Sequence, residues 1–280
     1  MKKDVYEMVT DRIIEQLEQG VIPWEKPWGG VIDGAYNRIS KRPYSLLNQM
    51  LLQHSGEYAT FKQWSELGGH IRKGEKSEIV VFWKLQPYED ENADGEKIIK
   101  QIPLLRYYNV FHVSQVDGVE PKELDLNDFE PIEEAERIKT EYMTQEHLKI
   151  LEKLTDKAFY SPAFDYIQVP CKEQYQNVEE FYSTLFHEMV HSTGYKTRLD
   201  REDVKDCMYF GSENYSKEEL TAELGSAFLV NLLGIETEKS FRNSSAYIQG
   251  WSGRLRGDKK FIVSASSKAE KAVKYILNEQ

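Results

Sequence analysis

The 280-residue sequence predicts an α+β protein built from two domains. Two runs rich in β-branched and aromatic residues, 77–85 and 104–113, lie in the first part of the chain. An acidic, proline-containing segment at 117–136 then precedes a helix-rich second part. We therefore predict a small α+β domain at residues 1–116, a linker at 117–136 and a second domain at 137–280.

The composition indicates a soluble, reduced protein, which we expect in the cytoplasm without a membrane contact. No apolar run is long enough to span a membrane, and the N-terminus has no apolar signal region. Neither Cys171 nor Cys207 belongs to a CxxC pair, so we expect no disulfide framework and no thiolate zinc site. Residues 117–136 carry about −8 of the net charge of −11, so the flanking domains are only weakly acidic.

Short elements follow one another in the first domain. An amphipathic helix at 4–19 ends at Gly20, and a proline-stiffened loop at 22–30 follows it. Beyond the basic turn that comes next, further short segments are expected: a helix at 45–53, a helix at 58–67, a strand–turn at 70–76, the strand at 77–85, a hairpin tip or flexible loop at 89–97 and the strand at 104–113.

This domain mixes cationic and aromatic side chains without a large net charge. That combination suits single-stranded nucleic acid, because bases stack on aromatic rings while the cations contact phosphates. The alternatives are core packing for the tryptophans and a solvated surface for the cations. The candidate residues are Trp24, Trp28, Arg38, Lys41, Arg42, Tyr44, Trp64, Arg72, Lys73 and Lys76.

The second domain is predicted to be mainly helical. A strand at 164–169, expected at a sheet edge, could hold an extended peptide. The predicted helices are 135–151, 177–194 with Asn177 as cap and Gly194 as stop, 215–234, and one or two closing helices within 244–275.

His187 and His191 lie one turn apart on the helix at 177–194. Two imidazoles at this spacing point the same way and can bind one Zn²⁺. Glu188 is rotated by about 100° from His187, so it can reach a water beside the metal and act as general base. The HExxH pattern therefore predicts a zinc hydrolase, with a pair of ordinary solvated or packed histidines as the alternative.

A third ligand is needed, and no histidine follows His191. We predict Glu219 as that ligand and Glu223, one turn later, as the carboxylate that accepts the free N–H of a ligand histidine. Two alternatives stay open. Glu219 could instead form a capping box with Ser216, and Asp200 could be the ligand.

Several motifs together resemble the ArdC-type antirestriction proteins of conjugative plasmids and other mobile elements. They are PWEKPW at 23–28, RPYSLLN at 42–48, TFKQWSELGGHIRKGEKSEIVVFW at 60–83, FHEMVHSTG at 186–194, YSKEELTAELGSAFL at 215–229 and AYIQGW at 246–251. The resemblance implies an N-terminal domain that binds single-stranded DNA, a zincin-like metallopeptidase domain and a role in protecting incoming DNA from restriction. It also implies His187, His191 and Glu219 as metal ligands with Glu188 as base.

Two functions compete on this sequence. In the first, the N-terminal domain binds single-stranded DNA and the zinc site hydrolyses a peptide bond in a DNA-associated protein, with Tyr209 or Tyr215 as oxyanion donor. In the second, the protein only coats single-stranded DNA and its zinc is structural. An intact Glu188 and three ligands in place of four favour the first. The missing signal region and disulfides argue against a secreted protease.

Overall fold

A computed structural model describes residues 3–19, 21–25, 34–91, 97–122, 131–155, 157–175, 177–205, 213–235 and 245–279. Its mixed helices and strands confirm the predicted α+β class. Within these ranges, no helix combines the length and apolar character that a bilayer crossing requires.

The N-terminal part is organised by a four-stranded sheet of order β1-β2-β5-β4. β1 runs parallel to β2, and the other two neighbouring pairs are antiparallel. A short pair, β3 with β6, lies beyond it. The strands are β1 Ala35–Asn37, β2 Gly56–Ala59, β3 His70–Ile71, β4 Glu78–Glu91, β5 Lys97–His112 and β6 Val116–Asp117.

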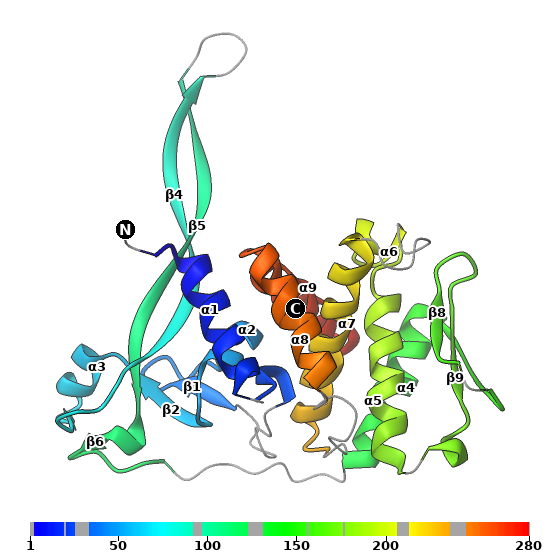
Figure 1. Ribbon diagram of the computed structural model, residues 1–280, viewed down its shortest axis with the longest axis horizontal. Helices are drawn as coiled ribbons and strands as arrows, with labels where there is room; N and C mark the ends of the chain where they lie inside the picture. Colours follow the sequence, from blue (N-terminus) through cyan, green and yellow to red (C-terminus); the bar gives the residue numbers. More distant parts are fainter. Residues whose placement is uncertain are drawn as a thin grey trace.

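β4 and β5 form a hairpin arm that extends far from the body of the molecule (Figure 1). We expected strands only at 77–85 and 104–113, and the observed pairing continues to Glu91 and Lys97. Most side chains in this outer half are exposed. With no face to bury, the segment carries no alternating apolar pattern that would identify it as a strand.

Three helices accompany the sheet: α1 Val5–Glu18, α2 Leu46–Leu51 and α3 Phe61–Glu66. Asp4 and Glu7 form a capping box on α1, and Thr60 and Gln63 form one on α3. The expected helix at 58–67 is therefore too long, because Tyr58 and Ala59 belong to β2. The polar cap Thr60, directly after the strand, marks the change of element.

The C-terminal part packs helices against a three-stranded sheet of order β7-β9-β8. The strand expected at a sheet edge is β9, and it is central, so that prediction is wrong. The helix expected at 135–151 ends at Glu146, and β7 follows it. The elements are α4 Pro131–Glu146, β7 Lys149–Lys153, β8 Phe159–Ser161, β9 Tyr166–Pro170, α5 Val178–Ser192, α6 Glu202–Lys205, α7 Glu213–Leu232, α8 Ser245–Gly257 and α9 Phe261–Ile276.

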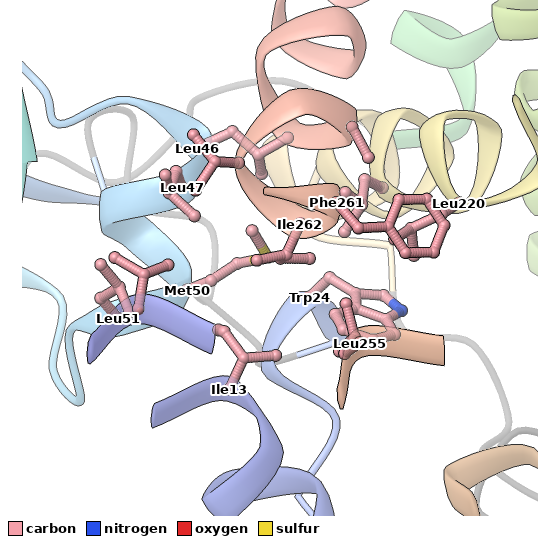
Figure 2. Packing of buried hydrophobic residues seen from close by; sticks show 14 of the residues in the cluster. Ile13, Trp24, Leu46, Leu47, Met50, Leu51, Leu220, Leu255, Phe261 and Ile262 are labelled. Atoms are coloured by element: carbon pink, nitrogen blue, oxygen red, sulfur yellow. The ribbon is translucent and has the colours of Figure 1, made fainter. Parts of the chain in front are cut away.

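An apolar core at the meeting of the two parts contains residues from both. Ile13 of α1 and Met50 of α2 belong to one buried cluster with Leu220 of α7, Leu255 of α8 and Ile262 of α9 (Figure 2). A second core lies under α5 and the C-terminal sheet. The N-terminal helices therefore share their core with the helices of the second half.

Candidate metal centre

α5 carries the predicted motif and is positioned by its buried face. Asn177 caps its first turn by accepting a hydrogen bond from the Glu180 backbone N–H at 2.9 Å. Phe181, Leu185 and Met189 on the apolar stripe are fully buried. The predicted helix is thus confirmed, and it presents its histidines on the side that faces α7.

α5 and α7 approach closely because small residues lie between them. A Cβ on Gly225 would come within 2.7 Å of the Val190 side chain, so a larger residue would push the helices apart. Ser226 Oγ donates to the Ser183 backbone oxygen at 2.7 Å. This contact brings the acidic first half of α7 to the histidines of α5.

His187, His191 and Glu219 converge on one point. The Nε2 atoms of the two histidines are 3.1 Å apart, and Glu219 oxygens lie 3.6 Å from His187 Nε2 and 3.5 Å from His191 Nε2. Donor atoms around a tetrahedral metal with bonds of ~2.1 Å are about 3.4 Å apart. Two imidazoles and one carboxylate therefore form a candidate divalent-metal site, and the donor set fits a catalytic metal that leaves one position open.

The alternatives for the third ligand do not match the structure. α7 begins at Glu213, so Ser216 lies inside the helix and cannot cap it. Asp200 is not part of the group of residues that could hold a metal. Glu219 is therefore the carboxylate that completes the cluster.

Electrostatics prepare this cluster for a cation. Burial alone would lower the pKa of His191, but the contacts with Glu218 and Glu219 raise it to about 10. Burial would raise the pKa of Glu219, yet the two histidines hold it well below its usual range. Glu219 is therefore ionised at neutral pH.

Glu218 occupies the position that we predicted for Glu223. Its Oε1 lies 3.1 Å from His191 Nδ1, on the ring nitrogen opposite the cluster. Glu218 is fully buried, and Arg201 binds both of its oxygens at 3.0 Å and 2.6 Å. This arrangement fixes the tautomer and orientation of His191, and sequence reasoning missed both Glu218 and Arg201.

The predicted hydrogen bond from a ligand histidine to Glu223 is wrong. Glu223 follows Glu219 by one turn on α7, but its Oε2 is buried without a hydrogen-bond partner. Glu218 directly precedes Glu219 on the same helix. Only the rotation of α7 against α5 decides which carboxylate meets a ring nitrogen.

The loop after α5 is held by two buried arginines. Arg198 contacts both oxygens of Asp165 at 2.8 Å and 2.9 Å and one oxygen of Glu146 at 2.8 Å. Arg201 also donates to the Val190 backbone oxygen at 2.7 Å. A Cβ on Gly194 would lie 2.3 Å from Val204, so this glycine is needed for close packing. In the sequence, two arginines shortly after the HExxH helix were the signal that could have indicated this buried network.

Glu188 is buried on the helix beside the metal ligands. Burial raises the pKa of the Tyr175 phenol, the Thr184 side chain opposes that shift, and the Glu188 charge adds to it. The predicted oxyanion donors, Tyr209 and the Tyr215 side chain, lie outside the described residues, as does Cys207.

The predicted DNA-contacting residues do not form one surface. Trp24 and Trp64 are fully buried, so neither offers a ring face to a base, and the core-packing alternative is correct for both. Arg38 pairs with the buried Glu57, and Arg72 pairs with Glu75.

The remaining candidates are placed differently. Lys41, Arg42, Lys73 and Lys76 are exposed, and Tyr44 is half-buried. Trp28 lies outside the described residues.

Two family models match consecutive parts of the chain. The N-terminal domain of anti-restriction factor ArdC matches residues 3–111, and a zincin-like metallopeptidase domain matches residues 136–268. The two matches confirm an ArdC-type N-terminal domain followed by a zincin-like domain.

Curated relatives extend over almost the whole chain. The chain is 33% identical to a DNA primase TraC of Escherichia coli in an alignment of 298 positions, which covers 99% of this chain but 27% of that protein. A second TraC of Escherichia coli is 32% identical, with 20% of its length covered. The uncharacterized protein y4eC of Sinorhizobium fredii is 33% identical over 293 residues, with 92% of it covered. The chain thus spans about a quarter or less of the TraC primases.

Two solved structures are similar to this chain over almost its whole length. The metal-free crystal structure of the antirestriction protein ArdC from plasmid R388 has a TM-score of 0.75 and 33% identity, over 99% of this chain and 100% of that one. Its Mn(II)-bound structure has a TM-score of 0.76 and 31% identity, over 99% and 98%. This chain belongs to the ArdC family of antirestriction proteins.

Proposed function

We propose that this protein binds single-stranded DNA through its N-terminal domain and hydrolyses peptide bonds of a DNA-associated protein at a zinc site. The observation that carries the peptidase part is the convergence of His187, His191 and Glu219 with Glu188 next to them. In the cell, this combination would protect incoming DNA from restriction by acting on the proteins that meet it.

The residues have separable roles in hydrolysis. His187, His191 and Glu219 hold the metal, which when bound lowers the pKa of a water and polarises the scissile carbonyl. Glu188 takes the proton from the attacking water and returns it to the leaving amine. Glu218 and Arg201 keep the His191 ring aligned.

Three protein ligands support a catalytic metal over a structural one. Structural zinc sites usually close with four protein ligands, whereas catalytic sites keep one position for water or substrate. A buried carboxylate at Glu188, adjacent in sequence to a ligand, serves no purpose in a purely structural site. The non-catalytic DNA-coating alternative leaves Glu188 unexplained.

DNA binding is supported by the family and by the relatives. The N-terminal match is to a domain of an anti-restriction factor, and two curated relatives are named DNA primases. The shared region in these proteins therefore fits a module that brings the metal site to single-stranded DNA.

Glu188→Gln tests the peptidase, with Glu179→Gln on the first turn of α5 as matched control. The probe is fluorescein-labelled casein, with and without an oligo-dT strand. Loss of cleavage by about 10²-fold or more in Glu188→Gln, with bound zinc and oligo-dT affinity unchanged, is the expected result. Equal cleavage by both variants contradicts a role for Glu188. A wild type that binds zinc and oligo-dT without cleaving favours the non-catalytic alternative.

A further inference from the structure

A groove of about 860 Å³ lies where the β4–β5 hairpin meets the body of the protein. It is lined by the base of the hairpin, by the turn around Ser40 and Tyr44, by α3 and by α9. We propose that this groove is the binding site for single-stranded DNA, with a base stacked on Tyr108. The inference rests on the DNA-binding part of the proposed function and gives that function a location.

Phe82 and Tyr108 form an aromatic platform in this groove. Their rings are stacked with centroids 4.6 Å apart and an interplanar angle of 5°. Tyr108 is 55% exposed, which leaves ring surface open to solvent. A base that stacks on this surface would extend the existing column of rings. Base–aromatic stacking is insensitive to sequence, as a protein that handles any incoming strand requires.

Exposed cationic side chains lie beside the platform and in the turn that lines the groove. Arg106 lies directly opposite Phe82 in the hairpin register, and Lys84 follows two residues along the same face. Lys41 and Arg42 lie between Ser40 and Pro43, two residues that line the groove. All four are exposed, and none has an ion-pair partner within the described ranges. They are therefore available to phosphates in a chain that is acidic overall.

The acidic residues of the groove wall are neutralised by neighbours. Glu66 lies 3.7 Å from Lys62, and Glu270 lies 3.1 Å from Lys274. Each carboxylate therefore has a cationic neighbour that reduces its repulsion of a phosphate. The local balance at the platform is positive, which complements a nucleic-acid backbone.

At Val81, a side chain already occupies the edge of β4 in the groove. Asn48 of α2 donates to the Val81 backbone oxygen at 2.8 Å and accepts from the Val81 N–H at 2.7 Å. An extended peptide needs these groups in order to pair with an edge strand. The exposed ring face and the cations suit unpaired bases and phosphates.

A fluorescently labelled 12-nucleotide oligo-dT, titrated with the full-length protein, tests the site by anisotropy. Tyr108→Ala should weaken binding about tenfold, and Tyr108→Phe should restore it, because stacking needs the ring and not the hydroxyl. Arg106→Gln should lower the slope of log K against log salt by about 0.7, the contribution of one phosphate contact on a single strand.

Two control variants change similar side chains outside the groove. Tyr88→Ala removes an exposed tyrosine nearer the hairpin tip, and Lys149→Gln removes an exposed cation on β7. Both should bind oligo-dT like the wild type. Thermal melting of each variant shows that it is folded.

The outcomes separate the site from the function. If the wild type binds oligo-dT but folded Tyr108→Ala and Arg106→Gln bind equally well, the groove is not the site, and DNA binding stands. If the control variants weaken binding as much as the groove variants, the site is also wrong. If the wild type does not bind oligo-dT at all, the DNA-binding part of the proposed function fails, and this inference fails with it.

Discussion

Arg201 donates from Nε and Nη2 to the two carboxylate oxygens of Glu218, at 3.0 Å and 2.6 Å. The Glu218 carboxylate in turn orients the His191 ring, because its Oε1 lies 3.1 Å from His191 Nδ1. The metal-facing nitrogen of His191 is thus held by a buried arginine in the loop that follows α5. Neither partner is a ligand, yet both determine where the ligand points.

Glu218→Gln should weaken zinc affinity about 10- to 100-fold, because an amide cannot supply the charge that orients and polarises His191. Glu223→Gln is the matched control and should have a smaller effect, since Glu223 Oε2 has no hydrogen-bond partner and His191 Nδ1 contacts Glu218 instead. Competition with a fluorescent zinc chelator measures both constants. A larger loss in Glu223→Gln would restore our original assignment of that residue.

Trp24→Ala should lower the free energy of unfolding by roughly 3–5 kcal/mol, as expected when a large aromatic side chain leaves a buried core. Trp24 packs with residues from both halves, and its backbone oxygen accepts from Asn231 Nδ2 at 3.1 Å. Denaturant unfolding followed by circular dichroism gives the change. A variant of unchanged stability with reduced oligo-dT affinity would mean that this ring contacts DNA after all.

The buried Glu57 should make the protein less stable in acid. Burial would raise the pKa of Glu57, but hydrogen bonds from Arg38, the Lys122 backbone and Tyr36 lower it below its usual range. The folded state therefore binds this proton more weakly than the unfolded chain. The stabilisation is complete above the unfolded pKa of about 4.3 and is lost as pH falls through the lower folded value.

Denaturant unfolding of metal-free protein between pH 3 and pH 7 measures this dependence. Glu57→Gln should cost about 1–3 kcal/mol at pH 7, because Arg38 then has no charged partner. The difference from wild type should shrink below pH 4. The exposed Glu120→Gln serves as control. A Glu57→Gln penalty that stayed constant from pH 7 to pH 3 would show that ionisation of Glu57 does not stabilise the fold.

The metal helix could be predicted because several local signals agree. Asn177 caps it, its apolar residues follow the helical period, and the two histidines fall one turn apart. Glu219 followed from the need for a third ligand. Glu218 could not be distinguished from Glu223, because both are acidic neighbours on α7 and the sequence does not show how that helix is rotated against α5.

The N-terminal part was less predictable for a different reason. Trp24 is buried by α7 and α8, which are about two hundred residues distant in the chain, so local composition gave no sign of it. The outer hairpin is exposed on both faces and lacks the alternation that reveals a strand. Tyr108 and Arg106 were not predicted because they lie within a strand. Strand pairing, and not sequence proximity, places Arg106 opposite Phe82 and lets the Tyr108 ring stack on it.

The metal content of the purified protein tests the central claim most directly, with wild type measured beside His187→Ala and Glu219→Ala by elemental analysis after zinc reconstitution. We predict one zinc per wild-type chain and its loss in both variants, while folded secondary structure persists in circular dichroism. Zinc retained in Glu219→Ala would remove that residue from the site. A folded wild type without zinc would contradict the metallopeptidase account and leave a DNA-coating protein as the better description.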